Sequence, residues 1–260
     1  LFTPLKNGPM TAGQVAQELE VRPDRLKPLL YALGAAGLLI AEEDRFSNTL
    51  EADHFLVRGG DAYIGAMHRA FRRRWDGVLK TADTIRTGIP QDLSDFSSMP
   101  ADRMEALARN RESEVKQAVR VLMARYDFSS YKALLDVGGG AGYLSIAMAQ
   151  ASPHLQATVV DLPTVTHIAQ QVVAESGLSA RVQVVTADVA NESLNGSFDL
   201  AILKSVIQVL SADQARIAIK NVGQVLQPGG AIYILGRVID DSRTTPLETV
   251  GQNLVFLDLY

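Results

Sequence analysis

The stretch Leu134–Gln150, LLDVGGGAGYLSIAMAQ, is the part of the sequence from which the fold can be inferred most directly. An apolar run ends in Asp136, four of the next six residues are glycine, and an amphipathic stretch follows. Glycine permits a tight turn from a strand into a helix and lets a ligand approach the backbone closely. The stretch therefore predicts a strand, a turn and a helix, with a ligand at the turn.

After residue 131 the sequence alternates between strand-like and helix-like patterns. Strands are expected at 133–137, 157–161, 182–186, 198–204 and 231–235, and helices at 142–151, 164–176 and 212–226. This order predicts an α/β fold with a parallel sheet that helices cover on both faces. Ligands bind such sheets at the carboxyl ends of the strands, where the strand order reverses.

Acidic residues follow three successive predicted strands. Asp136 ends the first strand, Asp161 ends the second in ATVVDLP, and Asp188 follows the third in VVTADVA. A carboxylate at the end of the second strand can bind both hydroxyls of a ribose, and one after the third can contact an adenine amino group. The three positions favour a nucleoside ligand over unrelated surface aspartates.

The glycine spacing separates two kinds of nucleoside ligand. Gly138, Gly140 and Gly142 have the spacing G-x-G-x-G, with Leu144 after them. A nicotinamide dinucleotide site usually has G-x-G-x-x-G, which holds a pyrophosphate. The spacing therefore favours a ligand without pyrophosphate, S-adenosylmethionine (SAM).

The first 53 residues have the pattern of a winged helix. Thr11 and Gln14 have capping-box spacing at the start of one helix, and Pro23 fits the first turn of a second. Leucines and an alanine then recur at helical spacing, at Leu26, Leu29, Leu30, Leu33 and Ala36. The run LLIAEEDRFSNT predicts two short strands around an acidic turn, the wing.

A winged helix raises the possibility of DNA binding. Arg22, Arg25 and Lys27 could contact phosphates. These basic residues are few, and Glu18, Glu20 and Asp24 offset them. A dimerisation or packing module is therefore favoured over a DNA-binding domain.

Residues 54–130 are expected to be mostly helical. Met67, Phe71, Trp75 and Leu79 recur at helical spacing, and the range 102–126 predicts one long helix. His68 lies in this region, which would cover a ligand pocket.

The composition restricts the classes of function. The chain has 260 residues, a formal net charge of -4 and no cysteine, which excludes disulfides, thiolate nucleophiles and cysteine-bound metals. The net charge argues against a dominant nucleic-acid or membrane role. No apolar run approaches the roughly 20 residues that span a bilayer. No signal peptide is visible, so a cytoplasmic location is expected, and the first residue, Leu1, leaves open that further residues precede it.

Two long stretches, LLDVGGGAGYLSIAMAQASPHLQATVVDLPTV and GSFDLAILKSVIQVLSADQARIAIKNVGQVLQPGGAIYIL, resemble the SAM-dependent O-methyltransferases of the caffeic-acid and hydroxyneurosporene type. The resemblance covers nearly the whole chain. It implies a winged-helix dimerisation region over 1–53, a helical dimerisation and pocket region over 54–130, and a Rossmann-like SAM-binding domain over 131–260. By position, it implies SAM contacts at Asp136, Gly138, Gly140, Asp161, Leu162, Asp188, Val189 and Lys204.

The catalytic block departs from this family. The family has a K-x-x-x-H-D-W run whose histidine removes the acceptor proton, and a glutamate after the fifth strand that positions it. Here the run is KSVIQVL, which places Gln208 at the histidine and Gly236 at the glutamate. A neutral amide cannot accept a proton near pH 7, so Gln208 is expected to line the pocket without acting as a base. If a histidine serves as a replacement base, His68 is the best candidate, but a surface histidine beside Arg69 is the favoured interpretation.

The sequence thus predicts a SAM-dependent methyltransferase that acts on a small aromatic or polyketide-like molecule and forms a homodimer through its N-terminal region, with no nucleic-acid or membrane partner and no metal. A SAM-binding relative with altered chemistry (hydroxylation, decarboxylation or a pericyclic step) and a non-catalytic pseudo-methyltransferase are the alternatives, and a DNA-binding regulator comes last. The substrate and its acceptor atom (O, C or N) stay open. Because the family continues beyond FLDLY, the sheet is expected to lack its last strands.

Overall fold

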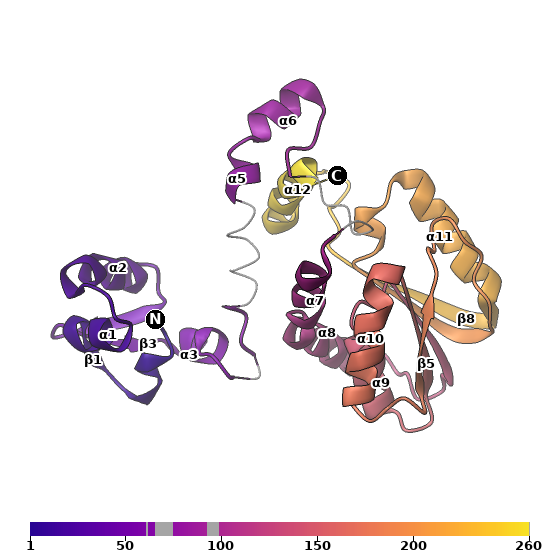
Figure 1. The fold of residues 1–260 in the computed structure, drawn as a ribbon, viewed down its shortest axis with the longest axis horizontal. Coiled ribbons are helices and arrows are strands. Elements are labelled where there is room, and N and C mark those ends of the chain that lie inside the picture. The colour runs from indigo at the N-terminus through magenta and orange to yellow at the C-terminus, as the bar shows by residue number, and fades with distance from the viewer. Residues whose placement is uncertain (61, 66–74, 93–98, 260) are drawn as a thin grey trace. The chain divides into compact units, whose positions relative to one another are not determined.

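A computed structural model describes the chain except residues 61, 66–74, 93–98 and 260 (Figure 1). The chain forms two compact units, Leu1–Arg72 and Arg73–Tyr260, and each is described by itself.

The first unit contains the predicted helix-turn-helix and wing. Its elements are η1 (Pro4–Asn7), β1 (Met10–Thr11), α1 (Ala12–Glu18), α2 (Pro23–Ala35), β2 (Leu39–Glu42), β3 (Arg45–Asn48) and α3 (Leu50–Leu56). The strands form an antiparallel sheet in the order β1-β3-β2. The capping box is confirmed, because the backbone N–H of Gln14 donates to Thr11 and the N–H of Thr11 donates to the Gln14 side chain. The acidic wing turn is also confirmed, with Glu43 and Asp44 both at positive φ.

The core of the first unit is built from the inward positions of these elements. Val15, Leu30 and Phe46 are almost fully buried within it. Of the residues at helical spacing, Leu26 and Leu30 are buried, whereas Leu29 and the C-cap residue Ala36 are exposed. Helical spacing identifies an apolar face but does not say how wide a stripe the neighbouring elements cover.

The second unit has a five-stranded parallel sheet, as predicted. The strands are β4 (Ala133–Val137), β5 (Gln156–Asp161), β6 (Val182–Thr186), β7 (Phe198–Lys204) and β8 (Leu226–Leu235). Their order is β6-β5-β4-β7-β8, so the chain reverses its direction across the sheet between β4 and β7. β8 begins earlier than the predicted 231, because Leu226 already pairs with Phe198 before an irregularity in the register. The switch between β4 and β7 fixes where a ligand is expected.

Helices cover both faces of this sheet. The crossover helices are α9 (Tyr143–Ala151), α10 (Pro163–Glu175) and α11 (Ala212–Val225), each close to its predicted range. The helices α9 and α10 share one apolar core with the sheet, and α11 shares a separate one on the other face. The result is a three-layer α/β/α arrangement, visible in Figure 1.

The helical region that precedes the sheet differs from expectation in one place. It comprises α5 (Trp75–Val78), α6 (Thr81–Thr87), α7 (Ala101–Arg109) and α8 (Glu112–Arg125). The predicted single helix over 102–126 is therefore two helices, separated at Asn110 and Arg111. Asparagine has a low helix propensity, and the break lets α7 pack against α10 while α8 packs against α9.

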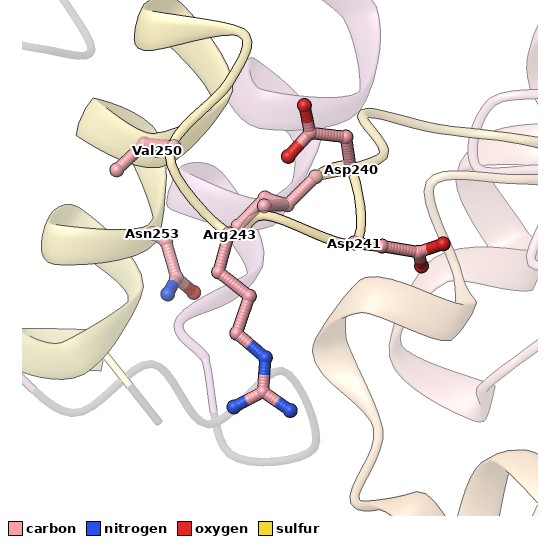
Figure 2. Close-up of a pocket in the computed structure, with 6 residues that line it drawn as sticks. Asp240, Asp241, Arg243, Val250 and Asn253 are labelled. Carbon is pink, nitrogen blue, oxygen red and sulfur yellow. The ribbon is translucent and has the colours of Figure 1, made fainter.

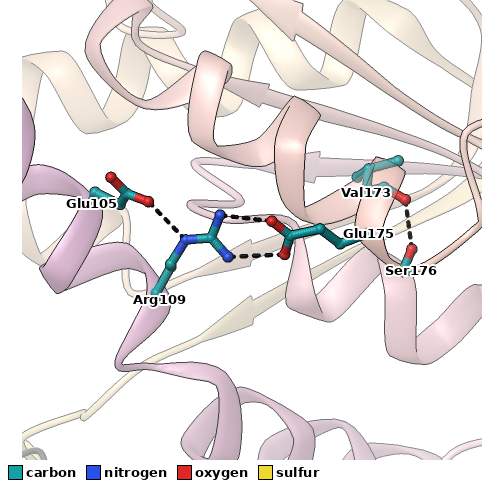
Figure 3. Close-up of polar contacts among 5 residues, drawn as sticks. All are labelled: Glu105, Arg109, Val173, Glu175 and Ser176. Atoms are coloured by element: carbon teal, nitrogen blue, oxygen red, sulfur yellow. Dashed lines mark hydrogen bonds and ion pairs between the residues drawn. The ribbon is translucent and has the colours of Figure 1, made fainter.

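A bidentate ion pair holds α7 on α10 (Figure 3). The Arg109 guanidinium donates to both carboxylate oxygens of Glu175 at 2.9 and 3.0 Å, and its Nε donates to Glu105 at 3.0 Å. Two parallel bonds fix orientation as well as distance. The last residue of α7 is thus tied to the last residue of α10 just before the chain turns into α8.

A buried carboxylate attaches the last helix, α12 (Leu247–Leu259), to α6. The carboxylate of Asp258 accepts hydrogen bonds from the hydroxyls of Thr81 at 2.5 Å and Thr84 at 2.7 Å. Of the apolar positions expected on one helix near residue 75, Trp75 and Leu79 are exposed, whereas Met67 and Phe71 lie outside the described residues. None of the described helices is long and apolar enough to cross a membrane.

Candidate functional site

The glycine turn after β4 has a conformation that only glycine adopts readily. Gly138, Gly140 and Gly142 have φ values of +62°, +60° and +80°. The N–H of Gly138 donates to the carbonyl of Val160 at 2.7 Å, which draws the turn towards β5. A Cβ atom on Gly138 would overlap Cγ2 of Val206. The turn therefore needs glycine for its backbone and for the close approach of the segment after β7.

Asp136 lies beneath this turn and is almost completely buried. Its Oδ2 accepts a hydrogen bond from the Ser145 hydroxyl at 2.8 Å, whereas its Oδ1 is buried with no hydrogen-bond partner among the described residues. Burial raises the pKa of Asp136 to about 6, the Ser145 hydroxyl opposes this rise, and the charge of Asp161 adds to it. An unpaired buried carboxylate oxygen marks a place where a ligand or a water molecule can donate.

Asp161 lies beside the turn at the end of β5. Its Oδ2 accepts from the N–H of Gly140 and its Oδ1 from the N–H of Leu162, both at 2.8 Å. Burial raises the pKa of Asp161, and these two N–H groups lower it in part. Each carboxylate oxygen can accept a further hydrogen bond, so the group is oriented and still able to bind two hydroxyls.

Asp188 is held within its own loop. Its Oδ1 accepts from the N–H of Ala190 at 2.9 Å and its Oδ2 from the amide of Asn191 at 2.7 Å. The amide of Asn221, on α11, donates to the carbonyl of the buried residue Val189 at 2.9 Å. The N–H of Ala187 donates to the carbonyl of Asp161 at 3.1 Å, which places this loop next to the Asp161 loop.

Lys204 ends β7 and reaches towards α8. Its Nζ lies 2.7 Å from Oε1 of Glu114, and its side chain is only 13% exposed. Burial alone would raise the pKa of Glu114, but the hydrogen bond from Lys204 and the charges of Lys204, Arg111 and Arg237 lower it overall. The lysine is therefore anchored at the carboxyl edge of the sheet.

Gln208 and Gly236 meet at this same edge. Gln208 lies in the short helix η2 (Ile207–Val209) after β7, and Gly236 directly follows β8. The N–H of Ser205 donates to the carbonyl of Leu235 at 2.7 Å and holds the two segments together. A Cβ atom on Gly236 would lie 3.2 Å from Oε1 of Gln208. Neither residue can take up a proton near pH 7.

A cavity of about 450 Å³ lies in the segment after Gly236 (Figure 2). It is lined by Ile239, Asp240, Asp241, Arg243, Val250 and Asn253, from the loop after β8 and from α12. In Figure 2 the Arg243 and Asn253 side chains extend the same way, and Asp241 points away from Asp240. The described residues hold no group of three or more His, Cys, Asp or Glu side chains suited to a metal ion.

The structure brings most of the predicted site residues together at the ends of β4, β5, β6 and β7. His68 lies outside the described residues, and the other histidines, His54, His154 and His167, are exposed. Sequence reasoning missed Ser145, Glu114 and Arg237. A serine between the apolar residues Leu144 and Ile146 at the start of helix α9 is a signal that could have identified Ser145. Nothing local in the sequence indicates that Glu114 pairs with a lysine ninety positions away.

Comparisons with known proteins agree with this geometry. Residues 88–259 match the family model of the O-methyltransferase domain. A 3-hydroxy-5-methyl-1-naphthoate 3-O-methyltransferase from Streptomyces sahachiroi is 30% identical, and the match covers 99% of this chain and 76% of that protein. The aclacinomycin 10-hydroxylase of Streptomyces purpurascens is 28% identical over 88% of this chain and 64% of that protein. The structure of human N-acetylserotonin methyltransferase in complex with SAM has a TM-score of 0.84 at 21% identity, covering 98% of this chain and 78% of that one.

Proposed function

The chain belongs to the O-methyltransferase family, and from this premise we propose that it transfers a methyl group from SAM to a small aromatic or polyketide-like molecule. The naphthoate O-methyltransferase that it resembles acts on a hydroxylated, fused aromatic acid, which supports this substrate class. The observation that carries the proposal is the arrangement of Asp136, the glycine turn and Asp161 at the ends of β4 and β5.

The residues at this edge fit SAM. The buried Oδ1 of Asp136 can accept from a cationic amino group, and the two oriented oxygens of Asp161 can accept from the two ribose hydroxyls. The glycine turn leaves space that side chains would otherwise fill. We propose that SAM is held by Asp136, Gly138, Gly140, Asp161, Leu162, Asp188, Val189 and Lys204. Bound SAM supplies an electrophilic methyl group on a sulfonium.

The chain's own contribution is then to hold and orient the acceptor. Holding two reactants in a productive geometry can lower a barrier by about 7–11 kcal/mol. Gln208 can donate to or accept from an acceptor oxygen but cannot remove its proton, and general-base catalysis typically contributes about 10²–10⁴-fold. An acceptor that is already nucleophilic would not need that contribution.

Altered chemistry on the same fold is the second candidate. The observation that favours it is the meeting of Gln208 with Gly236 in place of a base and its positioning acid, together with the similarity to a hydroxylase. Methyl transfer stays the first candidate because the described residues at the ends of β4 and β5 fit SAM and because the naphthoate relative is named as an O-methyltransferase.

The first unit is proposed to form a homodimer. Leu29, Ile40, Leu50 and Phe55 expose large apolar side chains on it, and an apolar surface that another copy covers would remove them from water. The location is proposed to be the cytoplasm, where SAM is made.

The experiment that tests the function uses SAM with an isotopically labelled methyl group. The protein is incubated with a panel of hydroxylated naphthoates, anthraquinones and aromatic amines, and the products are examined by mass spectrometry. Methyl transfer predicts that a product gains one methylene and carries the label. Oxygen incorporation without label would favour the second candidate, and no product from any acceptor, despite SAM binding, would favour a non-catalytic protein.

A further inference from the structure

The loop after β6, residues 188–192, is built around the carbonyl of Asp188 and is called the β6 loop below. The backbone N–H groups of Asn191 and Glu192 donate to this carbonyl at 2.9 and 2.7 Å, so the β6 loop is a single tight turn. The carboxylate of Asp188 accepts from the N–H of Ala190 at 2.9 Å and from the Asn191 amide at 2.7 Å. The turn therefore fixes the orientation of the carboxylate that is proposed to contact the adenine amino group.

Two carbonyl groups of the β6 loop accept hydrogen bonds from one side chain of α11. The amide nitrogen of Asn221 donates to the carbonyl of Val189 and to that of Glu192, both at 2.9 Å. A primary amide nitrogen has two N–H groups, so these two bonds use its full donor capacity. Because both partners are acceptors, only the nitrogen end of the amide can face them. Asn221 thus holds the loop at two separate points.

The β6 loop also makes an apolar contribution to the packing of α11. Val189 is 9% exposed and belongs to the same apolar core as Ala218 and Val222 of α11. Apolar burial is non-directional, whereas hydrogen bonds have a preferred distance and angle. The packing of Val189 therefore keeps the loop close to α11, and the amide of Asn221 sets how the loop is oriented.

The β6 loop is supported on both sides of Asp188. On the side that precedes it, the N–H of Ala187 donates to the carbonyl of Asp161 at 3.1 Å, which ties the chain to the end of β5. On the side that follows it, the bonds from Asn221 tie the chain to α11. The direction of the Asp188 carboxylate depends on both supports, because that carboxylate is bonded to residues of the turn itself.

We propose that Asn221 is a positioning residue for the methyl donor: it orients the β6 loop so that Asp188 accepts a hydrogen bond from the adenine amino group of SAM, and it thereby contributes to selectivity for adenine. The inference rests on the proposed methyltransferase function and adds a residue to the donor site. Asn221 acts through the loop and not by touching SAM, because both N–H groups of its amide are used within the protein.

The adenine amino group and the transferred methyl group lie at different ends of SAM. A loss of orientation at Asp188 should therefore weaken the binding of the donor and of its demethylated product alike and leave the transfer step unchanged. The KM for SAM should rise, while kcat at saturating SAM should stay the same. A residue that only stabilises the fold would lower the melting temperature without changing the affinity of the folded protein for either ligand.

The test compares S-adenosylhomocysteine with S-inosylhomocysteine by calorimetric titration. The inosyl ligand lacks the amino group that Asp188 is proposed to bind and carries a carbonyl oxygen in its place. Wild type should bind the adenosyl ligand about tenfold or more tightly, because a carbonyl oxygen cannot donate to a carboxylate. Equal affinity of wild type for the two ligands would overturn the inference.

Asn221→Ala removes both bonds to the β6 loop. It should weaken the binding of S-adenosylhomocysteine by about tenfold and that of S-inosylhomocysteine by less, so that the preference for adenine shrinks. Asn221→Asp keeps the size of the side chain but cannot donate when ionised, and it should shrink the preference at least as much. Asn221 is only half-buried, so the fold should tolerate both changes, which thermal unfolding checks. An undiminished preference in either folded variant would refute the role of Asn221.

Gln224→Ala is the matched control, because Gln224 is an exposed amide on the same helix. This variant should keep the affinity of wild type for both ligands. A loss in the control equal to that in Asn221→Ala would show that any change on α11 disturbs the donor site, which contradicts a specific role for Asn221.

The double variant Asp188→Ala, Asn221→Ala tests whether Asn221 acts through Asp188. It should bind S-adenosylhomocysteine about as weakly as Asp188→Ala alone, because the contact that Asn221 orients is already lost. Two losses that multiply in full would show that Asn221 affects the donor by another route and would contradict the inference.

Wild type separates this inference from the proposed function. A wild-type protein that binds S-adenosylhomocysteine and transfers the labelled methyl group, with Asn221 variants that keep its affinity and its preference for adenine, would retain the function and refute the positioning role. Failure of folded wild type to bind S-adenosylhomocysteine would instead refute the proposed function, and the inference with it.

Discussion

A Cβ atom placed on Gly236 would lie 3.2 Å from Oε1 of Gln208, although the two residues follow different strands. The parallel pairing of β7 with β8 brings their carboxyl ends together, and the hydrogen bond from Ser205 to Leu235 keeps them there. The two positions at which the sequence analysis expects the family's histidine and glutamate, residues 208 and 236, are therefore neighbours. Because the two positions are neighbours, the site can be tested by introducing a histidine and a glutamate there as well as by removing side chains.

Gln208→His alone should not create an efficient general base, because Gly236 provides no carboxylate to orient the imidazole. The double variant Gln208→His, Gly236→Glu should do so, and the rate for weakly acidic phenols should then rise through the usual histidine pKa of about 6.5. The measurement is the pH profile of kcat/KM for wild type and both variants. High activity with the new pH dependence in the single variant would contradict this reading.

Asp136→Asn should change how stability depends on pH. Burial raises the pKa of Asp136 from 3.8 to about 6, so the folded state binds its proton more tightly than the unfolded chain does. Ionising the group therefore destabilises the fold. This loss of stability is absent below pH about 4, grows as the pH rises, and is complete above pH about 6. A pKa difference of about two units then corresponds to about 3 kcal/mol of unfolding free energy, at about 1.4 kcal/mol per pKa unit.

The free energy of unfolding of the variant minus that of wild type should accordingly increase between pH 4 and pH 7. Urea unfolding of the protein without ligand, at several pH values, measures it. A difference that stays constant across this range would show that Asp136 ionises normally in the fold.

Gly138→Ala should destabilise the second unit for two separate reasons. A non-glycine residue in the left-handed region costs about 1–2 kcal/mol, and the new methyl group would overlap Val206. Adding Val206→Ala should relieve the overlap and leave only the backbone cost. Gly223→Ala is the control, since Gly223 lies within α11 with no atom close to its Cβ position, and it should stabilise by about 0.5–1 kcal/mol. Thermal unfolding checks all three, and equal effects at Gly138 and Gly223 would contradict the account.

The full-length protein should be a dimer in light scattering and should not bind DNA sequence-specifically. The cationic residues at the start of α2 are paired with acids: the N-cap residue Arg22 and Arg25 lie 3.1 and 3.6 Å from Asp24, and Lys27 lies 2.8 Å from Asp44. Few charges are left for phosphates. A monomeric mass would count against the dimer, and a salt-resistant complex with a defined DNA sequence would count against the second statement.

The sequence predicts those parts of this structure that depend on local patterns. The glycine turn, the strand alternation and the capping box at Thr11 are encoded within a few residues, and each is found as expected. The break at Asn110 was not predicted, because it depends on α7 docking against α10 through Arg109 and Glu175.

The candidate site also contains residues that the sequence predicts and residues that it does not. Asp136 and Asp161 could be placed from strand ends alone, since parallel strands bring their carboxyl ends to one edge. The hydrogen-bond partners of these carboxylates could not be predicted. The bond from the Ser145 hydroxyl to Asp136, for example, depends on how α9 packs against the sheet. The ion pairs at this edge likewise combine distant segments, since Lys204 of β7 pairs with Glu114 of α8 and Arg237 after β8 pairs with Glu248 of α12. Such pairs have no spacing that a sequence pattern can detect.

The most direct test of the central claim is calorimetric titration of the protein with SAM. Wild type should bind with one site per chain, and Asp161→Ala should bind about 10- to 100-fold more weakly, because a lost hydrogen bond to a charged group costs about 1.5–3 kcal/mol. Asp213→Ala, an exposed acid on α11, should bind like wild type. Failure of folded wild type to bind SAM, or equal affinity in Asp161→Ala, would contradict the account.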